Sequence, residues 1–293
     1  MQNLKKYISL ATATFYPSWP TNTSDKVRGD LAIETFKQIK RMGFDLYIAD
    51  GGSSNNFIST ILNLKGKIYV QKNIGLSAGR RWALTQASLK KDTLAIVLFE
   101  LEKISFIKNC LIKSVQPILE NRADIIIPKR DEKSFLSYPD YQASSEKLLN
   151  LKMASLIINT LKKRGETISP EINDIDFAFG PKVISNKPHV LDLFMDKYTS
   201  KTIIDEKKFQ CEMWANALFF PIIVALYKGM RIMSVPVSYI HPKEQTMLEL
   251  NNPLFIRKRE YQFKTLLAAT RELILLLEKN PKSRIKYTGR FYG

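Results

Sequence analysis

The sequence predicts an α/β fold built on a doubly wound, mostly parallel, Rossmann-like sheet with a C-terminal helical extension. Three observations support this prediction. Strand-like and helical segments alternate through the first half, residues 93–100 are almost wholly apolar, and residues 254–278 form a leucine-rich amphipathic stretch. Such alternation is typical of parallel sheets, because neighbouring parallel strands need a crossover that is usually a helix.

Short β-rich runs predict the strands. In the first half they cover residues 7–14, 44–49, 67–70, 93–100 and 124–128. The run at 93–100 has the composition of a strand buried on both faces, so we expect it at the centre of the sheet. In the second half, residues 177–184 and 231–241 are also strand-like.

Apolar residues at helical spacing predict the helices. They cover residues 31–42, 76–88, 104–119, 141–161, 211–228 and 254–278. Gly43 follows the first helix, as expected just past a helix end, and Ser53 can cap the helix after the second strand. No clear linker is visible, so we expect one domain over residues 1–250, with halves 1–103 and 104–250, and a helical tail over 251–293.

The composition favours a globular protein in a reducing compartment. The chain has 293 residues, of which 45% are hydrophobic, enough for one large domain or two small ones. Cys110 and Cys211 form no CxxC pair, so neither a disulfide framework nor a cysteine-built zinc site is expected, and a cytoplasmic setting fits. The first residues do not resemble a signal peptide. The longest apolar run, 213–227, is shorter than the ~20 residues of a membrane span.

The net charge of +17 and the pI of about 9.7 predict a surface that attracts polyanions. Nucleic acid, anionic lipid and phosphorylated small molecules are the classes concerned, although a general richness in lysine explains the charge equally well. The lysines are scattered, and no basic tail or aromatic-interleaved basic stripe is present. Nucleic acid is therefore not the expected partner, whereas peripheral membrane contact stays open.

Ligands of doubly wound sheets bind beyond the carboxyl ends of the strands. Glu100 and Glu102 follow the most apolar strand there. Residues i and i+2 at a strand end point to one face, where two carboxylates repel each other unless a cation lies between them. Mg²⁺ or Mn²⁺ bound together with a substrate diphosphate is one explanation. A solvated strand end with Lys103 as partner is the other.

Three further places follow strand ends. Thr14 and Phe15 end the first strand, and Asp50 ends the second, before two glycines. In a crevice Asp50 can accept hydrogen bonds from a base or ribose, or it stabilises its own turn. Gly75 opens a helix in which small residues and Arg80 suit a phosphate group, although tight helix–sheet packing explains the same residues.

The second half holds fewer candidates. His241 can complete a metal site through a neutral imidazole nitrogen, or it is a surface histidine before a proline. Trp214 suits a core, and Glu212 is either a buried polar anchor or a solvated residue. With two histidines and no G-x-S-x-G motif, a Ser-His-Asp hydrolase is not expected.

Taken in order, these segments resemble the nucleotide-sugar glycosyltransferases of GT-A fold, the large family-2-like group. Residues 13–16 (ATFY) stand where that group has P-T-Y-N, and residues 48–54 (IADGGSS) resemble V-D-D/G-G-S-T-D. Residues 73–81 (NIGLSAGRR) resemble N-x-G-x-x-x-A-R-N, and residues 100–102 (ELE) take the D-x-D position. This resemblance covers residues 7–103.

The second half resembles the glucosyl-3-phosphoglycerate and mannosylglycerate synthases, which retain the anomeric configuration. Residues 128–130 (PKR) match a Pro-Arg-Arg-like stretch, and Glu212 matches a glutamate on a helix. Residues 229–232 (GMRI), followed by His241, match a Gly-Arg-Ile stretch that precedes a metal-binding histidine in those synthases. Neither the E-D base motif of family 2 nor its Q-x-x-R-W motif is present.

The resemblance implies a hexosyltransferase that moves a sugar from a nucleotide-diphosphate sugar to an anionic small-molecule or glycan acceptor, assisted by Mg²⁺ or Mn²⁺. Residues 1–103 would form the nucleotide-binding half and 104–250 the acceptor half. The implied roles are nucleotide-sugar binding for Thr14, Phe15, Asp50, Gly75 and Arg80, metal binding for Glu102 and His241, catalysis for Glu100 and Glu212, and acceptor binding for Lys129, Arg130 and Trp214.

One departure and two rival functions accompany this expectation. Each glutamate of residues 100–102 carries one methylene more than the family's aspartates, which places a metal farther from the strand. A sugar-phosphate nucleotidyltransferase has a related sheet but usually a Gly-rich, lysine-bearing loop after the first strand, and residues 12–19 contain no glycine. A non-catalytic polyanion-binding protein on the same fold is the second rival.

Overall fold

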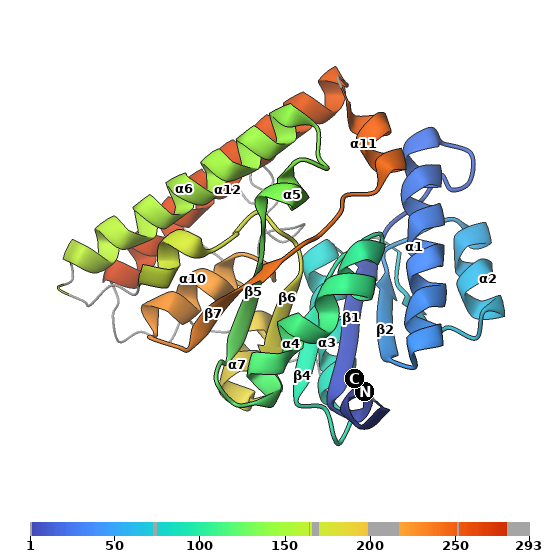
Figure 1. Ribbon diagram of the computed structural model, residues 1–293, viewed down its shortest axis with the longest axis horizontal. Coiled ribbons are helices and arrows are strands. Elements are labelled where there is room, and N and C mark those ends of the chain that lie inside the picture. Colours follow the sequence, from blue (N-terminus) through green and yellow to red (C-terminus); the bar gives the residue numbers. More distant parts are fainter. Residues whose placement is uncertain are drawn as a thin grey trace.

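The computed structural model describes residues 2–72, 75–163, 165, 170–198, 217–250 and 252–279. The described residues form a seven-stranded sheet in the order β3-β2-β1-β4-β6-β5-β7, with helices on both faces (Figure 1). The strands are β1 Ile8–Thr14, β2 Asp45–Asp50, β3 Ile68–Val70, β4 Ala95–Leu98, β5 Ile125–Arg130, β6 Lys182–Ser185 and β7 Ile232–Val237. Neighbours pair in parallel except around β6, which is antiparallel to β4 and β5. The predicted mostly parallel α/β sheet is confirmed.

Strand β4 lies at the middle of the sheet, between β1 and β6, as its apolar composition predicts. Its four residues are all buried. The strand is shorter than the predicted 93–100, because the chain leaves the ladder after Leu98 and turns at Leu101 and Glu102. Glu100 and Glu102 therefore do not lie on a regular strand, and the alternation that would place them on one face does not apply.

Two hydrophobic cores lie on the two faces of the sheet, since successive strand residues point to opposite sides. Ile125 and Ile127 belong to one core and Ile126 to the other. The Ile126 side is covered by α1 Thr23–Met42, α2 Asn55–Asn63, a π-helical turn at Phe106–Cys110 and α4 Leu111–Leu119. The Ile125 side is covered by α3 Leu76–Ser88, α6 Asp140–Lys163, α7 Pro188–Met195, α10 Phe220–Tyr227 and α12 Pro253–Lys279.

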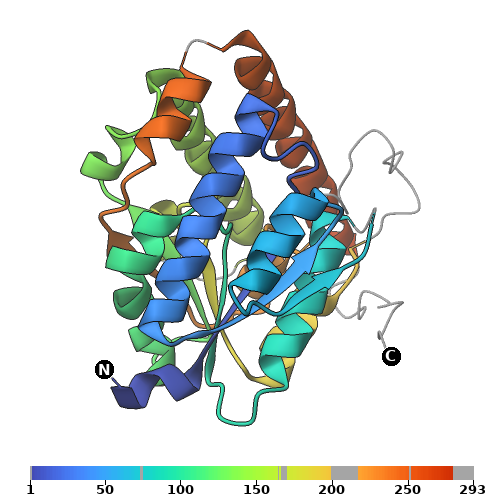
Figure 2. The same cartoon turned by 90° about the vertical axis from the view of Figure 1, so that its right-hand side faces the viewer.

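Helices α6 and α12 pack along each other over the second half of the sheet, and Figures 1 and 2 both show these two long helices together. The predicted terminal helix is thus α12, and its Leu266 and Leu273 belong to the Ile125-side core. Four short elements complete the described fold: η1 Gln2–Tyr7, α5 Glu132–Phe135, η3 Pro170–Asp174 and α11 Lys243–Glu249.

The helix ends follow local sequence signals with one difference. Gly43 ends α1 with a φ of 74°, a left-handed conformation that glycine adopts without strain. Helix α2 is capped by Ser54, whose side chain accepts a hydrogen bond from the Phe57 amide. The predicted cap, Ser53, instead donates its hydroxyl to Asp50. Of the predicted helix 211–228, residues 211–216 lie outside the described residues.

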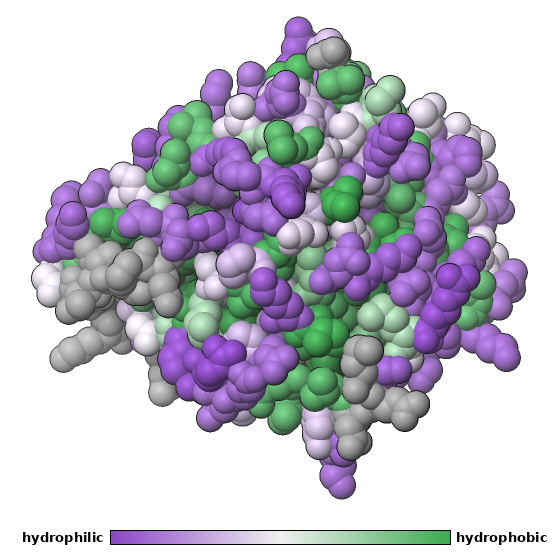
Figure 3. All heavy atoms as spheres, in the orientation of Figure 1, coloured by the Kyte–Doolittle hydropathy of each residue, from purple (hydrophilic) through white to green (hydrophobic). Residues whose placement is uncertain are grey.

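Hydrophilic side chains cover most of the face shown in Figure 3, in keeping with the net charge of +17. Among the helices of the described ranges, none is both long and apolar enough to cross a membrane.

Candidate functional site at the carboxyl edge

The carboxyl ends of β1 and β2 lie side by side, because Thr14 and Asp50 are paired in the parallel ladder. Asp50 is fully buried, and its two carboxylate oxygens accept four hydrogen bonds. The donors are the Thr14 hydroxyl at 2.7 Å, the Gly52 amide at 2.9 Å, the Ser53 amide at 2.7 Å and the Ser53 hydroxyl at 2.5 Å. These contacts favour the alternative in which Asp50 stabilises its own turn.

Phe15 is the exposed group at this edge. It follows β1 directly and is 50% exposed. Its ring lies close to Gly52, which has a φ of +120° and also approaches the backbone of Lys72. An exposed aromatic ring beside backbone and a lysine suits the stacking of a base, so of the three predicted base contacts Phe15 is the one accessible to a ligand.

The start of α3 brings Arg80 to the same edge. Gly75 is the N-cap residue of this helix, and the Ser77 hydroxyl accepts a hydrogen bond from the Ala217 amide, which ties α3 to the second half of the chain. Arg80 is largely buried, and its Nη2 lies 3.8 Å from Oε1 of Glu100. Burial lowers the pKa of Arg80, while Glu100 and Glu102 act against this shift. The predicted neighbours Arg80 and Glu100 thus lie together.

Glu100 lies in a place that only a glycine neighbour permits. A Cβ built on Gly180 would overlap the Glu100 carboxylate. Its Oε2 is buried and accepts no hydrogen bond from the described residues, although 27% of the side chain is exposed. Because part of the side chain is exposed, the predicted catalytic role of Glu100 stays a prediction that the geometry permits.

Lys182 is a site residue that sequence reasoning missed. It begins β6 opposite Leu98, at the carboxyl end of β4, and it is 1% exposed. Its ammonium group donates to the Phe179 carbonyl. Burial lowers the pKa of Lys182 to about 8, with Glu100 and Asp176 opposing and Arg130 and Arg80 assisting the shift. A single lysine within the apolar run 177–184 was the signal that could have identified it.

Glu102 contacts helix α1 through Arg28. Its Oε1 accepts from Nε and Nη2 of Arg28 at 2.8 and 2.5 Å, and its Oε2 accepts from the Tyr16 hydroxyl at 2.8 Å. Burial alone would raise the pKa of Glu102, but Arg28 and Tyr16 outweigh it and bring the pKa below its ordinary value. The side chain paired with Glu102 is thus Arg28 and not the alternative partner Lys103.

His241 lies beyond β7 and is 3% exposed, not at the surface. Its ring stacks on Tyr138 at a centroid distance of 4.1 Å, and its Nε2 lies 3.5 Å from Oε2 of Glu249. Burial lowers the pKa of His241, so the imidazole is neutral near pH 7. The predicted pairing of His241 with Glu102 stays a prediction, because no contact of the described residues connects the two.

The described residues do not fit a divalent ion at Glu102. Both carboxylate oxygens already have donors, and an ion would lie against the like charge of the Arg28 guanidinium. Within the described ranges, no group of three or more His, Cys, Asp and Glu side chains is arranged to hold a metal.

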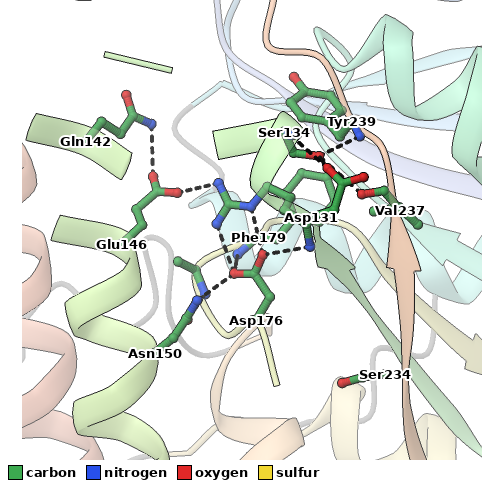
Figure 4. A network of polar contacts seen from close by, with 12 residues as sticks. Asp131, Ser134, Gln142, Glu146, Asn150, Asp176, Phe179, Ser234, Val237 and Tyr239 are labelled. Carbon is green, nitrogen blue, oxygen red and sulfur yellow. Dashed lines mark hydrogen bonds and ion pairs between the residues drawn. The ribbon is translucent and has the colours of Figure 1, made fainter. Parts of the chain in front are cut away.

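Arg130 differs from the prediction that it faces an acceptor. Its side chain is 1% exposed and lies between two carboxylates. Nε and Nη2 donate to Asp176 at 2.7 and 2.9 Å, and Nη1 donates to Glu146 at 2.5 Å. Figure 4 shows Asn150 pointing to Asp176 and Gln142 pointing to Glu146, which extends the network. The role of Arg130 is structural, because a buried arginine is stable only when its charge is paired.

Lys129 remains accessible at the end of β5. Its side chain is 42% exposed and forms an ion pair with Asp174 at 2.5 Å. Alternation along the strand turns it away from the Arg130 network, so it stays a candidate contact for an acceptor. The other two predicted residues of this half, Glu212 and Trp214, lie outside the described residues.

Known proteins resemble this chain in structure and not detectably in sequence. No protein-family model matches it, and neither does any curated protein sequence. Glucosyl-3-phosphoglycerate synthase from Mycobacterium tuberculosis, solved in complex with phosphoglyceric acid, superposes with a TM-score of 0.51 at 9% identity over 91% of this chain and 79% of that one. Mannosyl-3-phosphoglycerate synthase from Rubrobacter xylanophilus gives 0.50 at 11% identity over 99% of this chain and 80% of that one.

These superpositions and the mixed seven-stranded sheet show that the chain has the GT-A fold. The predicted likeness of the second half to the glucosyl- and mannosylglycerate-type synthases is confirmed at the level of fold, since both superposed proteins are of that type. At 9 and 11% identity the likeness establishes the fold alone, and a fold by itself does not define a reaction.

Proposed function

We propose that this protein is a glycosyltransferase that moves a sugar from a nucleotide-diphosphate sugar to an anionic acceptor. The observation that carries the proposal is the meeting of Arg80 and Glu100, 3.8 Å apart, beyond the central strand of a GT-A sheet. Ligands of such sheets bind at this edge. A guanidinium and a carboxylate there provide one group for a diphosphate and one for a sugar.

Each residue has a distinct part in this proposal. Phe15 stacks on the nucleotide base with its exposed ring. Arg80 and Lys182 supply positive charge to the diphosphate, which stabilises the charge that develops as this group leaves. Glu100 accepts a hydrogen bond from a sugar hydroxyl with its partly exposed carboxylate side chain. No step of this proposal passes through a metal ion, because the residues around Glu102 do not fit one.

An anionic acceptor is supported by two observations. The chain carries a net charge of +17, and Lys129 lies exposed at the carboxyl end of β5. The superposed glucosyl-3-phosphoglycerate synthase was solved with phosphoglyceric acid. For this chain a phosphorylated or carboxylated small molecule is accordingly the proposed acceptor class. Retention of the anomeric configuration, which the resemblance implies, belongs to the same proposal.

Thermal unfolding with nucleotides tests donor binding first. UDP, GDP and ADP are added separately, with Mg²⁺, with Mn²⁺ or with EDTA. At a hundredfold excess over its dissociation constant, a bound nucleotide adds about 2.7 kcal/mol to the free energy of unfolding. If none of the nine combinations raises the melting temperature, the donor-site proposal is wrong.

Transfer itself requires a second assay. The nucleotide that stabilises the protein is supplied as its sugar conjugate together with a panel of phosphorylated, carboxylated and neutral acceptors, and the release of nucleoside diphosphate is followed. Acceptor-dependent release with the anionic compounds supports the proposal. Donor binding without release by any acceptor would favour the non-catalytic binding protein instead.

A further inference from the structure

Arg28 of α1 forms a two-point contact with Glu102, 74 residues later in the chain. Both Nε and Nη2 donate to the same carboxylate oxygen, Oε1. The other oxygen accepts from Tyr16, whose ring lies 5.5 Å from the guanidinium carbon. Glu102 is therefore satisfied on both oxygens and neutralised by one fixed protein cation.

A divalent ion on this carboxylate would lie next to the charge of the Arg28 guanidinium, and the two like charges would repel each other. The Glu102 side chain is 7% exposed, so water would screen this repulsion only weakly. The Glu102 carboxylate raises the pKa of the Arg28 guanidinium above its ordinary value, so Arg28 stays charged at every physiological pH. The guanidinium holds the position that a metal would need.

One nitrogen of Arg28 is still able to bind a second anion. Its side chain is 35% exposed, and Nη1 forms no hydrogen bond with the described residues. The Tyr16 amide donates to the Ser53 hydroxyl, and the Tyr16 carbonyl accepts from the Ser54 amide. This places the Arg28 cluster against the loop that carries Phe15 and Gly52.

We propose that the Arg28 guanidinium, and not a divalent ion, is the cation bound at Glu102, and that its Nη1 group binds a phosphate of the donor. The second half of this inference rests on the donor-binding function proposed above, whereas the first half does not. Arg28 is then a binding residue of the donor site, and Glu102 is its ion-pair partner.

Calorimetry with Mn²⁺ alone tests the first half. Wild type and Glu102→Gln are compared, because glutamine keeps the shape and the acceptor for Tyr16 but loses the charge that a metal needs. We expect the Mn²⁺ affinity of the two proteins to agree within about twofold, since any ion that binds does so elsewhere. Loss of wild-type Mn²⁺ binding in Glu102→Gln would overturn the inference.

UDP binding in EDTA tests the second half, with GDP or ADP in its place if they are the nucleotides that bind. Glu102→Gln frees the charge of Arg28, so it should bind the nucleotide as tightly as the wild type or more tightly. The double variant Arg28→Met with Glu102→Gln removes both charges together and should bind about tenfold more weakly than Glu102→Gln. A metal-ligand role for Glu102 predicts instead that Glu102→Gln weakens nucleotide binding when Mn²⁺ replaces EDTA.

Lys26→Met is the matched control, because it removes an exposed cation from the same helix two residues away. It should leave nucleotide affinity unchanged. Equal affinity of the double variant and Glu102→Gln would show that Arg28 does not contact the donor. Absence of nucleotide binding by the wild type would instead contradict the proposed function, while the Mn²⁺ comparison would still decide which cation Glu102 binds.

Discussion

The carboxylate of Glu100 lies where any side chain on residue 180 would have to be. A Cβ on Gly180 would overlap the Glu100 carboxyl group, and the loop that carries this glycine leads straight into β6 and Lys182. The glycine therefore fixes where the Glu100 carboxylate can lie, of which Oε2 accepts no hydrogen bond from the described residues.

Gly180→Ala should displace Glu100 without unfolding the protein. The displaced atoms are the end of a flexible, partly exposed side chain, so we expect a loss of stability below about 1 kcal/mol. Sugar transfer should fall by about a hundredfold, as expected for a misplacement of roughly 1 Å at a reacting group. Denaturant unfolding and the transfer assay measure the two effects separately. Ala178→Ser, two residues away, is the control, and full activity of Gly180→Ala would exclude Glu100 from the reaction.

Arg130→Ala and Lys129→Ala should separate a structural residue from an accessible one. Arg130 joins Asp176 and Glu146 in the buried network, so its removal leaves two uncompensated carboxylates and should cost about 3–5 kcal/mol. Lys129 forms an exposed pair, so its removal should cost less than about 1 kcal/mol. Urea titrations give both free energies of unfolding. Similar values for the two variants would mean that the network does not stabilise the fold.

Phe15→Ala should weaken nucleotide binding and leave folding nearly unchanged. Stacking of a base on an aromatic ring contributes about 1–3 kcal/mol, which corresponds to a loss of affinity of about fivefold or more. Calorimetry with the nucleotide that binds the wild type measures the effect. Leu62→Ala removes a side chain of similar exposure on α2 and serves as control. Equal affinities of Phe15→Ala and wild type would remove Phe15 from the donor site.

Lys182 should make stability depend on pH in the alkaline range. Burial lowers its pKa to about 8 in the folded protein, against about 10.4 in an unfolded chain. Below pH 8 both states hold the proton, and the cost of burying the charge is fully present. Between about pH 8 and pH 10.4 the unfolded chain binds more protons, so the free energy of unfolding rises with pH.

Lys182→Met removes this titration. Its stability advantage over the wild type should therefore be greatest near pH 7 and should shrink by on the order of 2 kcal/mol by pH 10. Denaturant unfolding of both proteins at the two pH values measures the difference, and Lys129→Met controls for the loss of an exposed lysine. A constant difference between pH 7 and pH 10 would show that Lys182 titrates normally.

The pattern of apolar residues is enough to predict the class of fold and the position of its strongest elements. Helix α3 covers the predicted residues 76–88, and the predicted strand 93–100 contains the central strand, Ala95–Leu98. These predictions succeed because a helix or strand that is buried on one or both faces repeats its apolar residues with a fixed period. That period is the same whichever other segment packs against the element.

The partners of the charged residues depend on the tertiary fold and could not be read from the sequence. Glu102 and Arg130 were both predicted to face ligands, yet each pairs with side chains that the topology brings from distant segments: Arg28 for Glu102, and Glu146 with Asp176 for Arg130. A carboxylate that binds a metal and one that binds an arginine have the same place in a sequence motif. What distinguishes them is which cation reaches the carboxylate, and this depends on how the helices pack across the sheet.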